Sequence, residues 1–380
     1  MESERLIESA CEQTGLDDFG SDSFREGLVR YVDALNTEAQ LSAIGAVALE
    51  AQVTGNLVNR LRVVDWVKQH PEVRDEPVAA PLFVLGLPRS GTTYISRLLG
   101  CDPARRPLMG WEARDCVPPP EAATFTTDPR IAEARAAADM LDALNPAVKA
   151  MHYEAPDEPT ECVTLLAQDF KSLQLSVVAN VPTYDEWLIG CDETSAYQHH
   201  HLVLQLLQSR APGRWSLKSP HHSIALPELF AQYPDARVVV MHRDPVRVAA
   251  SLCSLAAALI GTFSDADHRA TIATHWPPIA GVIVDRVMEY RDAHGDASFL
   301  DVQYADLVAD PLATMKRIYD WAGDDLTAEA ETRMREYVAA NPQTRFGTHS
   351  YSLEGTGLDR RELEERFATY RDRYAVPSEA

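Results

Sequence analysis

The 380-residue sequence is poor in cysteine and in positive charge, and each shortage argues against a class of protein. Its six cysteines are scattered and form no C-x-x-C pair, so a disulfide framework is not indicated. Lys and Arg number 35 against 57 Asp and Glu, a formal net charge of −22. This balance argues against general nucleic-acid binding and against docking on an anionic membrane. A polyanionic ligand would need a local basic pocket that overcomes the overall field.

Long apolar runs are missing as well. The longest uncharged stretch, residues 248–264, falls short of the ~20 apolar residues that a membrane-spanning helix needs, and serines interrupt it. The first residues are acidic and contain no cleavable apolar signal. We therefore expect a reduced, cytoplasmic protein without stable membrane insertion.

The order of helical and strand patterns predicts the fold. Residues 1 to 75 have apolar positions at helical spacing, followed by a charged connector bounded by prolines. Short apolar runs then alternate with helical segments, which predicts a parallel, three-layer α/β sheet. The predicted strands are 82–87, 215–217, 237–242 and 298–302. The predicted helices among and after them are 92–99, 246–259, 311–321 and 328–340.

These elements suggest three regions. Residues 1–78 form a helical region packed on the core, residues 79–325 form the α/β core, and residues 326–380 form a C-terminal helical extension. Residues 121–213 are expected to be a helical insertion in the core, because a loop of that length without structure would be unusual.

A phosphate-binding loop follows the first predicted strand. The segment 86–93, GLPRSGTT, has the glycine spacing of the P-loop motif G-x-x-x-x-G-K-[ST], with Thr93 in the hydroxyl position. Backbone N–H groups and a helix N-terminus in such a turn bind anions. Thr92 occupies the position of the P-loop lysine, and Arg89 supplies a cation within the loop instead. Phosphoryl transfer from a nucleoside triphosphate needs that lysine and Mg²⁺. A phosphosulfate carries less charge at the transferred group, so hydrogen-bond donors and one or two cations can suffice.

The residues Pro88, Arg89, Ser90, Gly91, Thr92 and Thr93 resemble the 5′-phosphosulfate loop of sulfotransferases that use 3′-phosphoadenosine 5′-phosphosulfate (PAPS). Bacterial members and tyrosylprotein sulfotransferases have nearly this string. The resemblance implies that these six residues bind PAPS, that a sulfuryl group is transferred to a small acceptor, and that no metal is required.

A second motif lies after the strand 237–242. Arg243 precedes a helix opened by Pro245, where the missing N–H costs nothing, and Ser251 lies about two turns into that helix. An Arg followed by Pro and by Ser at this spacing resembles the 3′-phosphate motif of the same family. The resemblance implies that Arg243 and Ser251 bind the 3′-phosphate of PAPS.

Sulfuryl transfer needs a base for the acceptor and a cation for the bridging oxygen. The resemblance implies Lys218, at the end of the second strand, and Arg89 as cations. Two residues are candidate bases. Glu112 lies 23 residues beyond Arg89, in a region comparable to the one where tyrosylprotein and heparan-type sulfotransferases have a catalytic Glu. His222 follows the second strand, as a His does in cytosolic members, although the local spacing differs. Glu112 is the favoured prediction, and His222 stays open.

Several alternatives stay open. A P-loop small-molecule kinase would need a lysine at Thr92, and a non-catalytic module binding adenosine 3′,5′-bisphosphate (PAP) would tolerate loss of Glu112 and Lys218. Consecutive histidines 199–201 point in different directions on a helix, so we expect no metal site there. The segment 347–353, with His349 and Tyr351, resembles one near the end of bacterial members and has no assigned role. The sequence does not indicate the acceptor or the oligomeric state.

Overall fold

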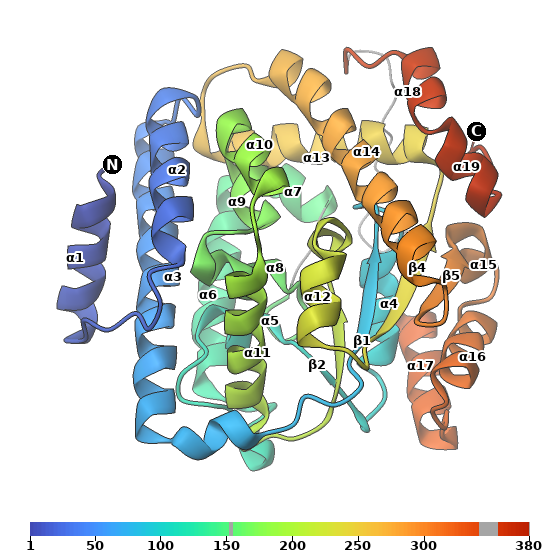
Figure 1. Ribbon diagram of the computed structural model, residues 1–380, viewed down its shortest axis with the longest axis horizontal. Coiled ribbons are helices and arrows are strands. Elements are labelled where there is room, and N and C mark those ends of the chain that lie inside the picture. The colour runs from blue at the N-terminus through green and yellow to red at the C-terminus, as the bar shows by residue number, and fades with distance from the viewer. Residues whose placement is uncertain (152–154, 342–355, 380) are drawn as a thin grey trace.

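The computed structural model describes residues 1–151, 155–341 and 356–379, and a five-stranded parallel sheet lies at its centre (Figure 1). The strand order is β2-β3-β1-β4-β5. The strands are β1 (Leu82–Gly86), β2 (Arg105–Pro107), β3 (Arg214–Lys218), β4 (Arg237–His242) and β5 (Phe299–Gln303). All four strands predicted from the sequence are confirmed, within about two residues at each end.

Strand β1 forms the middle of the sheet because every one of its residues is apolar or glycine and buried. Leu82 and Val84 face one hydrophobic cluster, whereas Phe83 and Leu85 face another on the opposite side. This alternation follows from the two-residue repeat of a strand. Burial on both faces is typical of a parallel sheet.

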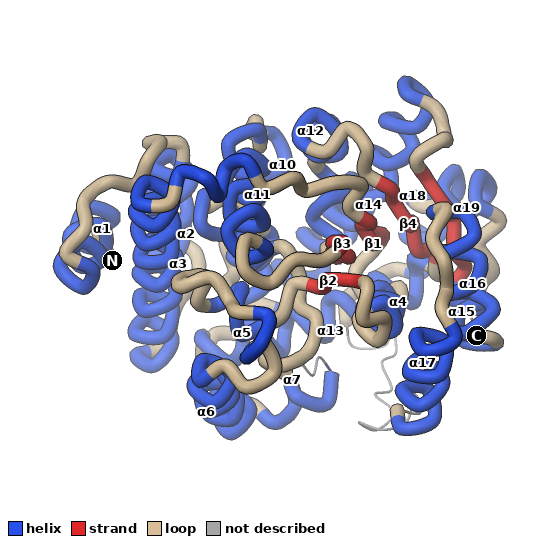
Figure 2. Tube along the Cα trace, turned by 90° about the horizontal axis from the view of Figure 1, so that it is seen from below, coloured by secondary structure: helices blue, strands red, loops and turns tan. Residues whose placement is uncertain are grey.

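The sheet lies between two helical layers (Figure 2). On one face, helices α4 (Thr92–Leu99) and α16 (Pro311–Ala322) pack on the strands. On the other face lie α11 (Thr194–Gln208) and α12 (Leu226–Gln232), and α14 (Arg269–His294) contacts the same cluster. The predicted three-layer α/β architecture is therefore confirmed.

The remaining helices surround this core. Before the sheet come α1 (Ser3–Thr14), α2 (Phe24–Thr37), α3 (Ala43–Gln69) and η1 (Pro71–Asp75). Between β2 and β3 lie α5 (Gly110–Arg114), η2 (Ala122–Thr124), α6 (Pro129–Leu144), α7 (Pro146–Met151), α8 (Val163–Leu166), η3 (Ala167–Asp169), α9 (Leu173–Val178) and α10 (Pro182–Gly190). After β3 lie η4 (Pro220–Ile224), α13 (Pro245–Phe263), α15 (Tyr304–Ala309), α17 (Ala328–Ala340), α18 (Arg360–Arg366) and α19 (Ala368–Tyr374).

The two ends of the described chain join the same body. Buried residues of α1–α3 form one hydrophobic cluster with α13 and α14. Leu363 of α18, Tyr370 of α19 and Phe367 between these two helices belong to the same cluster. Figure 1 shows α19 beside β5, at the opposite side of the molecule from α1. The sequence-based regional boundaries at residues 78 and 325 stay predictions.

Helix α13 is long and apolar enough to cross a membrane by length and composition alone. It is nevertheless a largely internal helix, since 61% of its most apolar window is buried inside the protein. It packs against α14, α9 and α3.

Candidate active site

The loop between β1 and α4 has the backbone of an anion-binding turn. Gly91 has a φ of 97° and Arg89 a φ of 68°, so the chain turns sharply before α4 begins at Thr92. The Ser90 hydroxyl donates to the Leu87 carbonyl at 2.6 Å and closes the turn from inside. The N-terminal N–H groups of α4 are thus directed toward the carboxyl edge of the sheet, where they favour an anion.

Glycine is required at position 91 for two reasons. Its φ is one that side chains rarely adopt, and a Cβ there would lie 2.9 Å from the Tyr304 ring. The same ring lies under the Arg243 guanidinium, whose Cζ is 3.9 Å from the ring centroid. Tyr304, which the sequence did not single out, therefore touches both predicted phosphate motifs.

The fold brings the two motifs together. Arg243 follows β4, and the Asp244 side chain caps α13 by accepting from Val246 N–H, which fixes the turn. Arg89 Nε donates to Ser251 Oγ at 3.2 Å, and Arg243 Nη1 donates to the Arg89 carbonyl at 2.9 Å. Residues separated by about 160 positions in sequence thus form one basic cluster.

Lys218 extends from the end of β3 toward the loop, and its side chain is 1% exposed. Its Nζ donates to Thr93 Oγ1 at 3.2 Å and to a carboxylate oxygen of Glu161. Glu161 was missed by sequence reasoning. It lies in an irregular segment before α8, held against β3 by the hydrogen bond from Cys162 N–H to the Lys218 carbonyl at 3.0 Å. No motif or periodicity in the sequence marks this position.

Glu112, the favoured sequence candidate for the base, lies in a closed environment. Its side chain is fully buried, and both carboxylate oxygens accept from the Arg106 guanidinium at 2.8 and 2.7 Å. One of these oxygens also accepts from Met109 N–H, at the start of α5. The Arg106 guanidinium in turn lies 4.5 Å from the Trp215 ring centroid. Glu112 therefore neutralises a buried arginine, and the structure does not bring it together with Lys218 through any described hydrogen bond.

His222, the second candidate base, lies in η4 and is also fully buried. Its Nδ1 lies 2.7 Å from the Tyr197 hydroxyl, and its Nε2 is buried without a hydrogen-bond partner among the described residues. Burial, together with the neighbouring His200 and His221, holds the pKa of His222 well below its ordinary value. The imidazole is therefore neutral, and its basicity is reduced.

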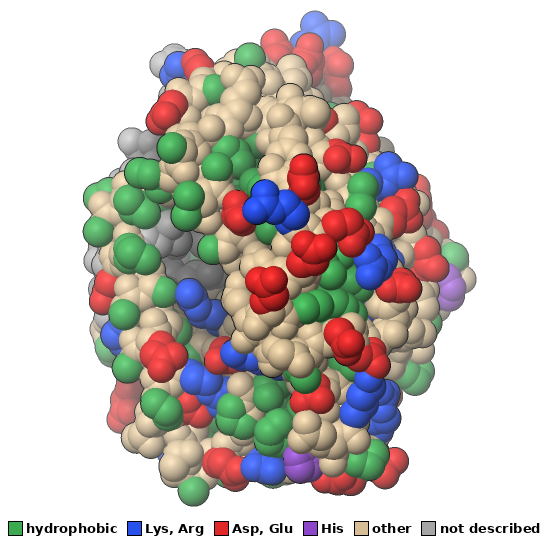
Figure 3. Space-filling view, turned by 90° about the vertical axis from the view of Figure 1, so that its left-hand side faces the viewer, with side chains coloured by type: hydrophobic (Ala, Val, Ile, Leu, Met, Phe, Trp, Pro, Cys, Tyr) green, Lys and Arg blue, Asp and Glu red, His purple; other side chains and the backbone are tan. Residues whose placement is uncertain are grey.

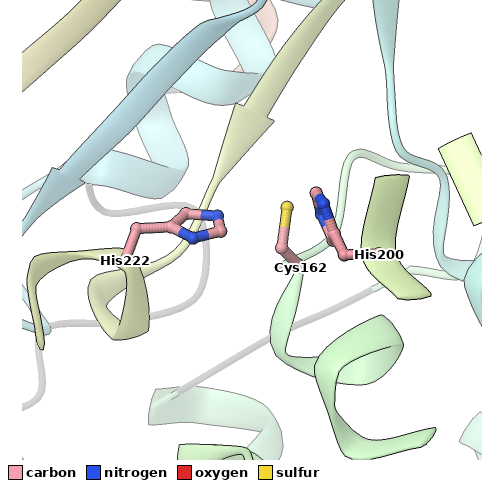
Figure 4. A group of neighbouring side chains, drawn as sticks. All are labelled: Cys162, His200 and His222. Carbon is pink, nitrogen blue, oxygen red and sulfur yellow. The ribbon is translucent and has the colours of Figure 1, made fainter. Parts of the chain in front are cut away.

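Figure 4 shows that Cys162 and His200 face His222 across the interior. The potential ligand atoms of the three residues lie within 4.8 Å of one another. Burial lowers the pKa of His200 to about 3 and raises the pKa of the Cys162 thiol to about 12. We interpret the group as a buried cluster of neutral side chains and assign no ion to it. It adjoins Lys218, because Cys162 N–H donates to the Lys218 carbonyl.

The described part of the C-terminal extension adds a further contact that the sequence did not indicate. The Glu379 carboxylate accepts from Arg243 Nε and Nη2 at 2.8 and 2.9 Å. Glu379 N–H also donates to the Asp244 carboxylate at 2.8 Å. The predicted residues His349 and Tyr351 lie outside the described residues.

One face of the molecule illustrates the overall charge balance. On the face that carries α1–α3, acidic and basic side chains are interspersed, and the coloured atoms show no broad basic patch (Figure 3). The concentration of Arg89, Arg243 and Lys218 at one edge of the sheet is therefore a local feature of a strongly acidic protein.

Comparison with known proteins agrees with this geometry. A model of the Sulfotransferase family matches residues 81–328. The crystal structure of sulfotransferase STF9 from Mycobacterium avium is 38% identical, with a TM-score of 0.91, over 99% of this chain and 97% of that one. Sulfotransferase STF1 from Mycobacterium tuberculosis H37Rv is 37% identical, with a TM-score of 0.87, over 97% and 99%.

A curated relative is more distant. Omega-hydroxy-beta-dihydromenaquinone-9 sulfotransferase Stf3 of Mycobacterium bovis is 25% identical over 313 residues, which cover 77% of this chain and 74% of the relative. The family match spans the sheet, both phosphate motifs and Lys218. The chain belongs to the sulfotransferase family.

Proposed function

We propose that this sulfotransferase takes its sulfuryl group from PAPS and transfers it to a hydroxyl or amine of a small-molecule, lipid or carbohydrate acceptor, releasing PAP. The observation that carries the proposal is the hydrogen bond between Arg89 and Ser251. One residue belongs to the predicted 5′-phosphosulfate loop and the other to the predicted 3′-phosphate motif. Their contact creates a single site suited to a nucleotide with phosphates at both positions.

The residues present fit such a donor. The loop 87–93 and the N-terminus of α4 would hold the 5′-phosphosulfate through backbone N–H groups, with Arg89 as the cation. Arg243 and Ser251 would hold the 3′-phosphate. Thr92 is buried in the position that a P-loop kinase gives to lysine, and Lys218 on the neighbouring strand would supply a second cation beside the loop. This arrangement favours PAPS over ATP.

The transfer step needs a cation at the bridging oxygen and a base at the acceptor oxygen. The acceptor oxygen forms a bond to sulfur while the bond from sulfur to the bridging oxygen breaks, and the electron pair goes to the 5′-phosphate of PAP. Lys218 would neutralise the charge that develops on the bridging oxygen. Its present contact with Thr93 at 3.2 Å puts the ammonium beside the phosphate loop.

For the proton of the acceptor we propose Glu161. Its side chain is 18% exposed, whereas Glu112 and His222 are fully buried. It already touches Lys218, so an acceptor bound over the loop would meet carboxylate and ammonium together. A base must lie within hydrogen-bond reach of the proton that it removes, and Glu161 is the one of these three candidates that solvent, and therefore an acceptor, can reach. The predictions for Glu112 and His222 remain the alternatives.

The acceptor and the compartment are proposed on coarser grounds. Stf3 is named for a hydroxylated dihydromenaquinone, so hydroxylated lipids are the first acceptors to try, followed by phenols, sterols and sugar alcohols. All six cysteines are free thiols, which supports the expectation of a reducing, cytoplasmic setting.

The donor can be tested by thermal shift without knowing the acceptor. A ligand that binds only the folded state stabilises it by RT ln(1 + [L]/Kd), about 2.7 kcal/mol at a hundred-fold excess over Kd. We expect PAP and PAPS to raise Tm clearly more than 5′-AMP does, and ATP with Mg²⁺ to add nothing beyond ATP alone.

Other outcomes would identify the alternatives. Equal stabilisation by PAP and 5′-AMP would exclude a dedicated 3′-phosphate site. A response to ATP that depends on Mg²⁺ would favour the kinase. PAP binding without turnover across the acceptor panel, unaffected by loss of Glu161 and Lys218, would favour the non-catalytic module.

A further inference from the structure

We propose that Glu379 is a built-in competitor for the 3′-phosphate of the donor, so that residues 377–379, here called the tail segment, must leave Arg243 before PAPS or PAP binds fully. The inference rests on the proposed function, because it assigns the role of 3′-phosphate ligand to Arg243. It concerns the regulation of that site and is independent of the choice of acceptor or base.

The first argument is the shape of the contact. Glu379 presents two oxygens to Nε and Nη2 of Arg243, at 2.8 and 2.9 Å. Guanidinium groups bind carboxylates and phosphates through the same pair of parallel hydrogen bonds. The carboxylate of Glu379 therefore occupies the donors that a phosphate would use. The third described donation of Arg243, from Nη1 to the Arg89 carbonyl, holds the guanidinium in place without using that edge.

The second argument is that the chain is anchored close to this contact. Val376 is buried in the hydrophobic cluster formed with α13 and α14, and its N–H donates to the Arg371 carbonyl at 3.0 Å. Beyond it, the Arg371 guanidinium donates to the Ser378 hydroxyl, and Glu379 N–H donates to Asp244. These contacts keep the carboxylate close to Arg243, so it competes at a high effective concentration.

The third argument is that the contact can open. The side chains of Arg243 and Glu379 are 14% and 29% exposed, so water reaches the pair. A pair at this exposure contributes modestly, which a doubly charged phosphate can exceed. Only the tail segment needs to move, because Val376, which precedes it, is the last described residue that contributes to the hydrophobic cluster.

The test compares PAP binding to the full chain and to Glu379→Gln by isothermal titration calorimetry. We expect Glu379→Gln to tighten PAP by about two- to five-fold, the range of a partly exposed ion pair. The affinity for 5′-AMP, which has no 3′-phosphate, should not change. Glu365→Gln is the matched control, because it removes the same charge from an exposed pair with Arg361 in the neighbouring helix α18.

A double-mutant cycle makes the test specific. In the Arg243→Ala background, PAP should bind more weakly, and adding Glu379→Gln should then have no effect. Unchanged or weaker PAP binding by Glu379→Gln alone would overturn the competitor, since it would make Glu379 irrelevant or a helper of the site. Failure of the unmodified chain to bind PAP at all would instead overturn the proposed function.

Discussion

Two ion pairs lie close to the sheet, and they differ in how many of their hydrogen-bonding groups already have partners inside the protein. Arg106–Glu112 is closed: both oxygens of Glu112 are used, both side chains are buried, and Arg106 also donates to the carbonyls of Ala211 and Leu207. Lys218–Glu161 is open: Glu161 keeps 18% of its surface exposed, and Lys218 divides its contacts between Glu161 and Thr93. A closed pair stabilises a fold, whereas an open pair can exchange partners during a reaction.

The largest effect should come from the open pair. Glu161→Gln should lower turnover by about 10²–10⁴-fold, the usual contribution of a general base, while Tm and the affinity for PAP change little. Steady-state kinetics with labelled PAPS and an accepted hydroxyl compound would measure this. Glu158→Gln is the control, because it lies in the same segment and also pairs with a cation, Arg97. Equal losses in both variants would mean that the segment is merely distorted.

The closed pair should respond in the opposite way. Glu112→Gln leaves the buried Arg106 without its counter-charge, and breaking a buried pair typically costs about 3–5 kcal/mol of unfolding free energy. Urea denaturation would measure the loss. Turnover per folded molecule should stay within a small factor of the unmodified enzyme. If Glu112→Gln instead keeps its stability and loses turnover, the sequence-based prediction of Glu112 as the base is right.

A smaller effect is expected from the buried cluster of neutral side chains that adjoins Lys218. The pKa of His200 is lowered to about 3 and that of His222 is lowered well below 6.5, so the unfolded chain binds protons more readily than the folded one. Stability is therefore fully present above about pH 6.5 and is lost as the pH falls, by about 0.7 kcal/mol per histidine between pH 7 and 6.

Urea denaturation at both pH values would measure this slope, and His200→Gln should reduce it. An unchanged slope in that variant would mean that His200 is protonated in the folded protein, or that other groups dominate the titration.

The sequence predicted the sheet well, whereas the contacts around the candidate site could be predicted only in part. Strand β4 contains a continuous apolar run, residues 238–241, and local pattern suffices to predict it. The missed strand, Arg105–Pro107, has only three residues and includes two arginines and a proline, so it has no apolar pattern. Its pairing with β3 at the edge of the sheet makes it a strand.

The same contrast applies to the site. The phosphate motifs are local in sequence, so Arg89 and Arg243 could be found from their neighbours. Glu161 and Glu379 acquire their significance only from residues 57 and 136 positions away. Glu112 is predicted as a base from its position in the sequence. In the structure it is buried and paired with Arg106, which lies only six residues away. The contacts formed in the folded chain, and not the position in the sequence alone, decide which carboxylate belongs to the closed pair and which to the open pair.

The ring of Tyr304 fixes the distance between the two predicted phosphate motifs. One part of its ring abuts the position of Gly91, and its face supports the guanidinium of Arg243. A flat, rigid ring cannot be compressed, so it sets the separation between the loop and the arginine. In the proposed function, PAP would bridge that separation with its two phosphates. We therefore expect the protein to discriminate between positional isomers, binding adenosine 3′,5′-bisphosphate in preference to the 2′,5′ compound, and a Tyr304→Ala enzyme to lose this discrimination while Tyr304→Phe keeps it.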